Sequence, residues 1–140
     1  MTIRLRAVRV AAAAGALLLG GCDASERAAR AEAADISRAV DAVRAADNPA
    51  KAGPLAALRD KSCSVADICA VKSLCIAAYE QHERALALVA EAKAGITAAP
   101  AASVAQTLTL AESALTRAKS QTDDCATRQG EMARHFKVAR

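Results

Sequence analysis

The sequence predicts an all-α protein, a three-helix bundle dominated by a long antiparallel helical hairpin and stapled by disulfide bonds. Alanine, the strongest helix former, makes up 40 of the 140 residues. Apolar residues recur at spacings of three and four along three segments, and no segment shows the strict alternation of a strand. Four cysteines between residues 63 and 125 can cross-link a domain that has few large apolar side chains.

The first predicted helix lies within residues 22–47, and its beginning serves as a tether. Its large apolar residues recur at spacings of four and three: Ile36, Val40 and Val43. Pro49 stops the helix, because the residue before a proline is disfavoured in the α region. Residues 48–63 contain two prolines and a glycine, so we expect a connector with about one helical turn.

Residues 64–140 are predicted to form the hairpin. Ser64 is the expected N-cap of a helix from Val65 to Ala94, and Gly95 ends it. Residues 103–106 have the form of a capping box and are expected to open the last helix. Two long helices joined by a short loop should fold back on each other.

The last helix carries a strict coiled-coil stripe that predicts one narrow seam. The stripe consists of Val104, Leu108, Ala111, Leu115, Ala118, Thr122, Cys125, Gln129, Met132 and Phe136. If the hairpin pivots at Pro100, facing residues have numbers that sum to 200. Ala85 then faces Leu115, and Ile68 faces Met132.

The same register predicts the disulfide pairing. Cys75 and Cys125 both lie 25 residues from the pivot, so they face each other, and Cys63–Cys69 remains as the second bridge. A pivot near residue 97 would instead pair Cys69 with Cys125 and Cys63 with Cys75. The rival to disulfides is metal ligation, but spacings of six do not match the two-residue gaps of zinc sites.

The N-terminal segment has the parts of an export signal. Its first nine residues carry three arginines and no acid, and residues 10–19 form an uncharged run too short to cross a membrane as a helix. The run ends in Leu19-Gly20-Gly21-Cys22. Residues 1–23 thereby resemble a bacterial lipoprotein signal peptide with its lipobox. The alternative is an ordinary signal peptide with a cysteine beside its cleavage site.

The resemblance implies that residues 1–21 are removed and that Cys22 receives a diacylglycerol thioether and then an acyl chain such as palmitate. The product would be anchored to a membrane of the bacterial cell envelope and face the periplasm. Asp23, directly after the cysteine, is similar to the inner-membrane retention signal of enteric bacteria, but that rule varies, so inner and outer membrane both stay open.

The charge balance does not favour nucleic acid as a partner. The net charge of +4 includes the three arginines of the signal segment, and 16 basic residues then remain against 15 acidic ones. One Tyr and one Phe offer no platform on which bases could stack.

The compact polar cluster of the chain is formed by Tyr79, Glu80, His82 and Glu83. It could bind a small ligand or a metal ion through the imidazole. The alternative is structural: His82 occupies a seam position opposite Ala118, where a polar residue fixes register. Catalytic motifs are not recognised, so we expect neither an enzyme nor a cofactor.

These observations predict a small helical binding or scaffold protein at the membrane surface, with an unknown protein partner in the cell envelope. An anchored heptad helix is similar to the murein lipoprotein family. That family attaches to peptidoglycan through a C-terminal lysine, whereas this chain ends in Arg140, so the linkage is not carried over. A self-assembling module, pairing through exposed leucines (Leu74, Leu88 and Leu110), is a further alternative.

Overall fold

A computed structural model of the chain describes residues 20–139, with the side chains of residues 20–22 left aside. The predicted signal peptide therefore lies outside the described residues, apart from its last backbone positions. The described part is all-helical, which confirms the predicted class, and it contains no strand. Its elements are α1 (Gly20–Ala45), the 3₁₀ turn η1 (Asn48–Ala50), α2 (Ala52–Asp60), α3 (Ala66–Gly95) and α4 (Ala101–His135).

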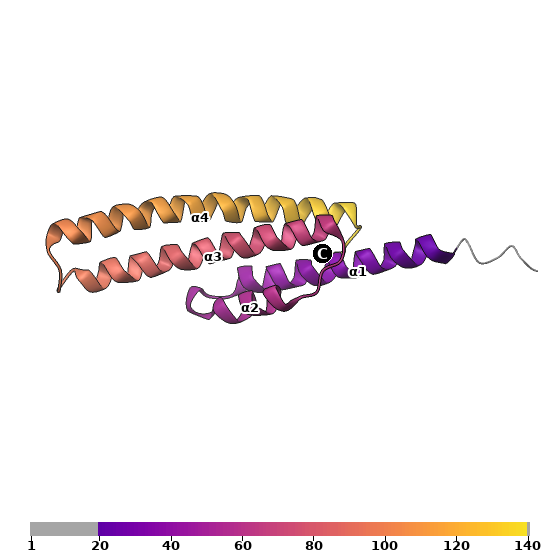
Figure 1. Ribbon diagram of the computed structural model, residues 1–140, viewed down its shortest axis with the longest axis horizontal. Coiled ribbons are helices and arrows are strands. Elements are labelled where there is room, and N and C mark those ends of the chain that lie inside the picture. Colours follow the sequence, from indigo (N-terminus) through magenta and orange to yellow (C-terminus); the bar gives the residue numbers. More distant parts are fainter. Residues whose placement is uncertain (1–19, 140) are drawn as a thin grey trace, which may run out of the picture.

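The two longest helices, α3 and α4, lie side by side along their length and run in opposite directions (Figure 1). The turn at residues 96–100 joins them at one end of the molecule. α1 and α2 lie against the other half of this pair, next to the start of α3 and the end of α4 (Figure 1). The beginning of α1 projects past the rest of the molecule, and residues 23–28 are exposed.

The interior is divided in the same way. A main core lies where all four helices meet, and its fully buried large side chains include Ile36, Leu55, Leu58 and Ile68. The distal half of α3 and α4 has a second, smaller cluster of Ala85, Ala114 and Ala118. Every residue of both clusters lies between positions 33 and 138, so residues 23–140 contain both hydrophobic clusters of the described part.

The distal seam differs from the prediction. Leu108 and Leu115 are 50% and 39% exposed, while Ala114 is buried against Ala85. The expected pairing of Ala85 with Leu115 is therefore wrong in this half. Helix axes normally lie about 8–10 Å apart, and alanine faces permit the close end of that range, whereas inward leucines would hold the helices apart.

The predicted connector at residues 48–63 also needs correction, because it contains a nine-residue helix, α2. Leu55 and Leu58 are one turn apart and both fully buried in the main core. Pro54 lies in the first turn, where a missing N–H is tolerated. A helix anchored by only two leucines has too short a periodic pattern to be recognised in the sequence.

Both predicted disulfides are present, which confirms the pairing. Cys75 and Cys125 link α3 to α4 with their Cα atoms 4.9 Å apart, across 50 residues of chain. Cys63 and Cys69 close a six-residue loop at the start of α3, with Cα atoms 5.5 Å apart. The alternative pairing of Cys69 with Cys125 is excluded.

Two helix C-termini are capped by lysines from elsewhere in the chain. The buried ammonium of Lys51 donates hydrogen bonds to the carbonyl oxygens of Val43 (2.9 Å), Arg44 (3.2 Å) and Ala46 (2.5 Å) at the end of α1. Lys72 donates in the same manner to carbonyl oxygens of residues 59 and 61 at the end of α2. Cations are stabilised at this position by the unpaired carbonyls and the helix dipole.

The start of α3 is capped by a carboxylate of α1. α3 begins at Ala66, and Ser64 is not its N-cap as predicted. Instead, Glu32 accepts hydrogen bonds from the backbone N–H groups of Ser64 (2.8 Å) and Val65 (3.0 Å) and from the Ser64 hydroxyl (2.5 Å). The hydroxyl bond is the main cause that lowers the pKa of Glu32 from its ordinary value.

A buried amide joins α4 to α1. Gln129 is 1% exposed, and its Nε2 donates to Ser37 and, at 2.9 Å, to a carboxylate oxygen of Asp41. Its Oε1 accepts a 2.6 Å hydrogen bond from Arg44. Because each polar atom is paired, this glutamine fixes the register of α1 on α4 at little cost in desolvation.

Candidate functional site

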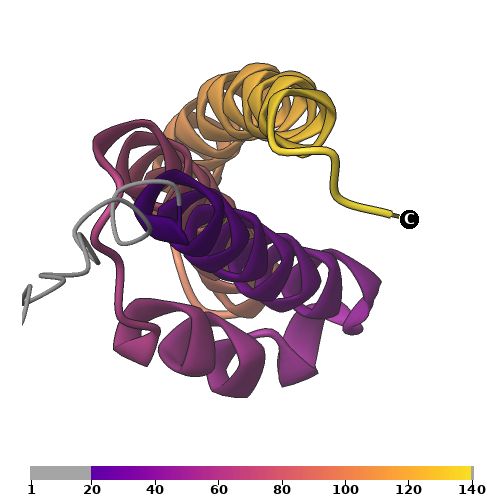
Figure 2. The same ribbon diagram turned by 90° about the vertical axis from the view of Figure 1, so that its right-hand side faces the viewer.

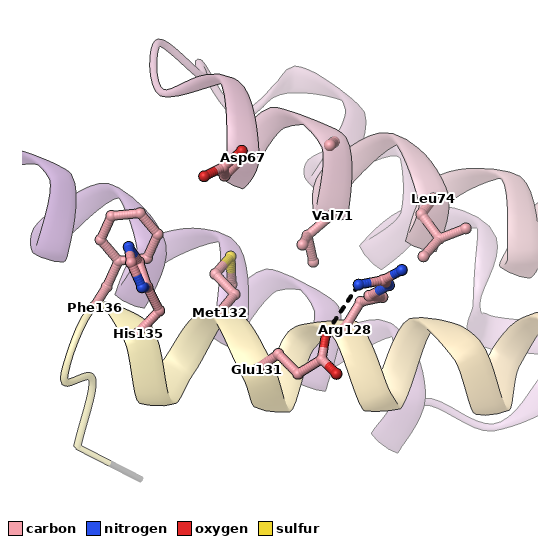
Figure 3. Close-up of a pocket in the computed structure, with 9 residues that line it drawn as sticks. Asp67, Val71, Leu74, Arg128, Glu131, Met132, His135 and Phe136 are labelled. Atoms are coloured by element: carbon pink, nitrogen blue, oxygen red, sulfur yellow. Dashed lines mark hydrogen bonds and ion pairs between the residues drawn. The ribbon is translucent and has the colours of Figure 1, made fainter.

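An open groove of about 540 Å³ lies between the first turns of α3 and the last turns of α4 (Figure 3). Residues at helical spacing on each helix form its two walls. From α3 come Asp67, Ala70, Val71 and Leu74, and from α4 and its C-cap come Arg128, Glu131, Met132, His135 and Phe136.

The floor of the groove is apolar. Val71, Leu74 and Phe136 are half-buried, and Met132 is buried and also belongs to the main core. Figure 3 shows the side chains of Val71 and Leu74 on one wall facing the wall that carries Met132. Methionine adapts to varied apolar shapes, and phenylalanine offers a large apolar area, so together they favour a surface that accepts a bulky apolar group.

Polar side chains form the rim. Arg128 and Glu131 make an exposed ion pair at 3.1 Å (Figure 3). The ring of His135 meets Phe136 edge-on, with ring centroids 4.7 Å apart. Asp67 lies in the first turn of α3, where its charge suits the helix dipole.

This arrangement is suited to binding. The apolar floor gains free energy by removing a partner's apolar surface from water. The rim carboxylates and the Arg128 guanidinium can hydrogen-bond the polar edge of the same partner.

The polar cluster predicted from the sequence is placed elsewhere. Tyr79 is 5% exposed and packs in the main core, and the Lys51 ammonium lies 5.9 Å from its ring centroid. His82 is half-buried, and its Nε2 lies 3.1 Å from Oδ1 of Asn48. The histidine thus contacts η1 through its side chain. A ligand-binding role for Tyr79, His82 and Glu83 stays a prediction, and none of the three lines the groove.

One group in the described part has metal-like geometry. Ligand atoms of Glu32, Cys63 and Cys69 lie within 4.8 Å of one another. The two sulfurs are joined in a disulfide, however, and the metal ligand is a thiolate. The carboxylate is already occupied by Ser64 and Val65. This group is a helix cap and not a metal centre.

The groove was not recognised from the sequence, although Met132 and Phe136 were placed in the seam. The available signal was the concentration of larger apolar side chains near the end of the last helix, among them the only phenylalanine of the chain. Lipidation of Cys22 stays a prediction, since its side chain is outside the described set.

Comparisons with known proteins place the chain in no group. No protein-family model matches the chain. No curated protein and no solved structure matches it either.

Proposed function

We propose that the protein is an exported bacterial lipoprotein, anchored in a membrane of the cell envelope through Cys22, that binds a partner protein in the groove between α3 and α4. The anchor is supported by the basic start, the short apolar run and the Leu19-Gly20-Gly21-Cys22 sequence. Two disulfides in so small a domain favour an oxidising compartment such as the periplasm. None of the helices among residues 20–139 is apolar over enough length to cross a membrane.

The architecture in this proposal is a three-helix bundle of α1, α3 and α4, built on the antiparallel α3–α4 hairpin, with α2 covering one side. The bundle is confined to the half of the molecule near Cys22, and α1 serves as the stalk. This geometry would hold the groove at a short, fixed distance from the membrane.

The observation that carries the binding proposal is the groove's apolar floor with its charged rim. A floor of Val71, Leu74, Met132 and Phe136 favours a partner that presents bulky apolar side chains, for example along one face of a helix. Such contacts bury a small number of large side chains that dominate affinity.

Two experiments test the two parts of the proposal. Wild-type protein should incorporate labelled palmitate in bacterial cells, and Cys22→Ser should leave an unprocessed, unlabelled precursor. Equal processing without label would indicate an ordinary signal peptide.

For the groove, a photo-crosslinking residue in place of Leu74 should yield one specific protein adduct in membranes. The same residue in place of Leu110, which is 52% exposed at the distal end, is the matched control. Equal adduct patterns at both positions would contradict binding in the groove, and an adduct with a second copy of the chain would favour the self-assembly alternative.

A further inference from the structure

A second concave site lies beside α1, and its charged residues are all cationic. It measures about 410 Å³ and contains Arg27, Arg30 and Arg38 of α1 together with Lys137, which follows α4. Alanine and valine side chains form its remaining wall. We call this site the basic pocket. Figure 2 shows the C-terminal residues leaving the end of α4 on the side of α1, which brings two distant parts of the sequence together.

Lys137 is held in a conformation that lysine disfavours. Its φ is 53°, the left-handed region in which glycine is usual after a helix. Its N–H donates to the carbonyl of Arg134 at 3.2 Å, and the N–H of Val138 donates to Ala133 at 2.8 Å. These two bonds form a Schellman motif. A lysine in the position of the usual glycine is strained, and such strain is retained chiefly where the side chain has a use.

The acids near the basic pocket do not neutralise it. Arg30 pairs with Glu26 at 3.2 Å, and Arg38 pairs with Asp35 at 3.3 Å, both at the exposed surface of α1. Exposed pairs of this kind contribute little and exchange partners readily. Within residues 20–139, no ion pair is found for Arg27 or Lys137, so two further cations are available to an anion.

The basic pocket lies near the proposed anchor. Arg27 is five residues beyond Cys22, which corresponds to about 7.5 Å along a helix. The Debye length at physiological ionic strength is about 8 Å, so charges at this separation still interact. Arg27, at the end of the pocket nearer to Cys22, is therefore within electrostatic reach of the headgroups of the membrane that would hold the acyl chains.

We propose that the basic pocket binds the phosphate of an anionic phospholipid headgroup. Arginine guanidinium groups bind phosphate oxygens in a bidentate manner, and Lys137 adds a point charge from the opposite wall. The inference rests on the proposed lipoprotein function, and it assigns to α1 and the tail the role of fixing the orientation of the molecule on the membrane.

The test uses the chain from Asp23 to Arg140, which retains both hydrophobic clusters and both disulfides but carries no acyl group. Co-sedimentation with phosphatidylcholine vesicles is measured with and without phosphatidylglycerol. We expect binding only to the anionic vesicles, and weaker binding as the salt concentration rises. The double variant Arg27→Gln/Lys137→Gln should bind roughly 25-fold more weakly, since each cation near an anionic surface contributes about fivefold.

The matched control is Arg84→Gln/Lys93→Gln, which removes the same charge from exposed positions on the distal half of α3. It should bind as the parent chain does. Equal losses in the two double variants would show a response to net charge alone and would overturn the proposal. Failure to bind anionic vesicles, or binding of inorganic phosphate in calorimetry without vesicle binding, would also overturn it.

The variant Lys137→Gly distinguishes an effect on vesicle binding from an effect on the stability of the fold. Glycine relieves the left-handed strain, so this variant should unfold at a higher urea concentration and yet bind anionic vesicles about fivefold more weakly. Wild-type vesicle binding by this variant would overturn the role of Lys137. Because the chain from Asp23 lacks Cys22, these results do not depend on lipidation, which palmitate labelling tests separately.

Discussion

The two disulfides should contribute unequally to stability, because they close loops of very different length. The Cys75–Cys125 bond spans 50 residues, and the Cys63–Cys69 bond spans six. In the loop-closure treatment the stabilisation grows with the logarithm of loop length. It amounts to about 4 kcal/mol for the long loop and about 2 kcal/mol for the short one at 25 °C.

The test compares two double variants, Cys75→Ala/Cys125→Ala and Cys63→Ala/Cys69→Ala, in the chain from Asp23 to Arg140. Urea unfolding followed by circular dichroism gives the free energy of unfolding of each. The first variant should lose about 2 kcal/mol more than the second. Burial acts in the same direction, since Cys75 and Cys125 are fully buried in the main core. An equal loss, or a larger loss for the short loop, would refute the reasoning.

Three further predictions address the interior and the helix ends. Ala114→Leu should destabilise the chain by about 1–3 kcal/mol in urea unfolding, because the alanine seam has no room for a larger side chain. Leu115→Ala, at the exposed neighbouring position, should change the stability by less than about 0.5 kcal/mol. A larger loss from Leu115→Ala than from Ala114→Leu would indicate that Leu115 is the buried residue, as the sequence predicted. Lys51→Met should cost about 1–3 kcal/mol in the same assay, because three carbonyl oxygens at the end of α1 lose their donor, and an unchanged midpoint would show that water replaces the ammonium. The lowered pKa of Glu32 contributes stability that is fully present above the ordinary value of 4.5 and is lost as the pH falls through the folded-state pKa. Glu32→Gln should therefore make the urea midpoint of unfolding less sensitive to acid. A midpoint that depends on pH as in the parent chain would contradict this.

The helical class followed from local features of the sequence, and the cysteine pairing followed from the expected register of the last two helices. Alanine-rich segments with a 3–4 spacing of apolar residues have few alternatives to a helix. Gly95 marked the end of α3 as predicted, because glycine lacks helix propensity and sits readily at a helix end. A hairpin with its pivot at Pro100 was then expected to place Cys75 opposite Cys125, and a disulfide joins these two residues.

The first residues of the helices were harder to predict from the sequence. α4 begins at Ala101, two residues before the expected capping box, and no side chain caps it. α3 is capped by Glu32, more than thirty residues away in the sequence. Capping rules treat only neighbouring residues, so a cap supplied by another helix leaves no local signal.

The sequence by itself determined the secondary structure class, because that depends on local composition and on the spacing of residues along one helix. It also indicated which cysteines pair, through the register expected of two facing helices. The lipobox-like N-terminus stays a prediction. Tertiary structure alone decided which face of α4 is buried: with α1 and α2 confined to one half of the hairpin, alanines line the distal contact, and Leu108 and Leu115 stay exposed. It also brought Lys137 to the arginines of α1 and opened the groove beside Phe136. These features depend on contacts between residues about a hundred or about sixty positions apart. The spacing of residues along one helix does not specify how that helix lies against another.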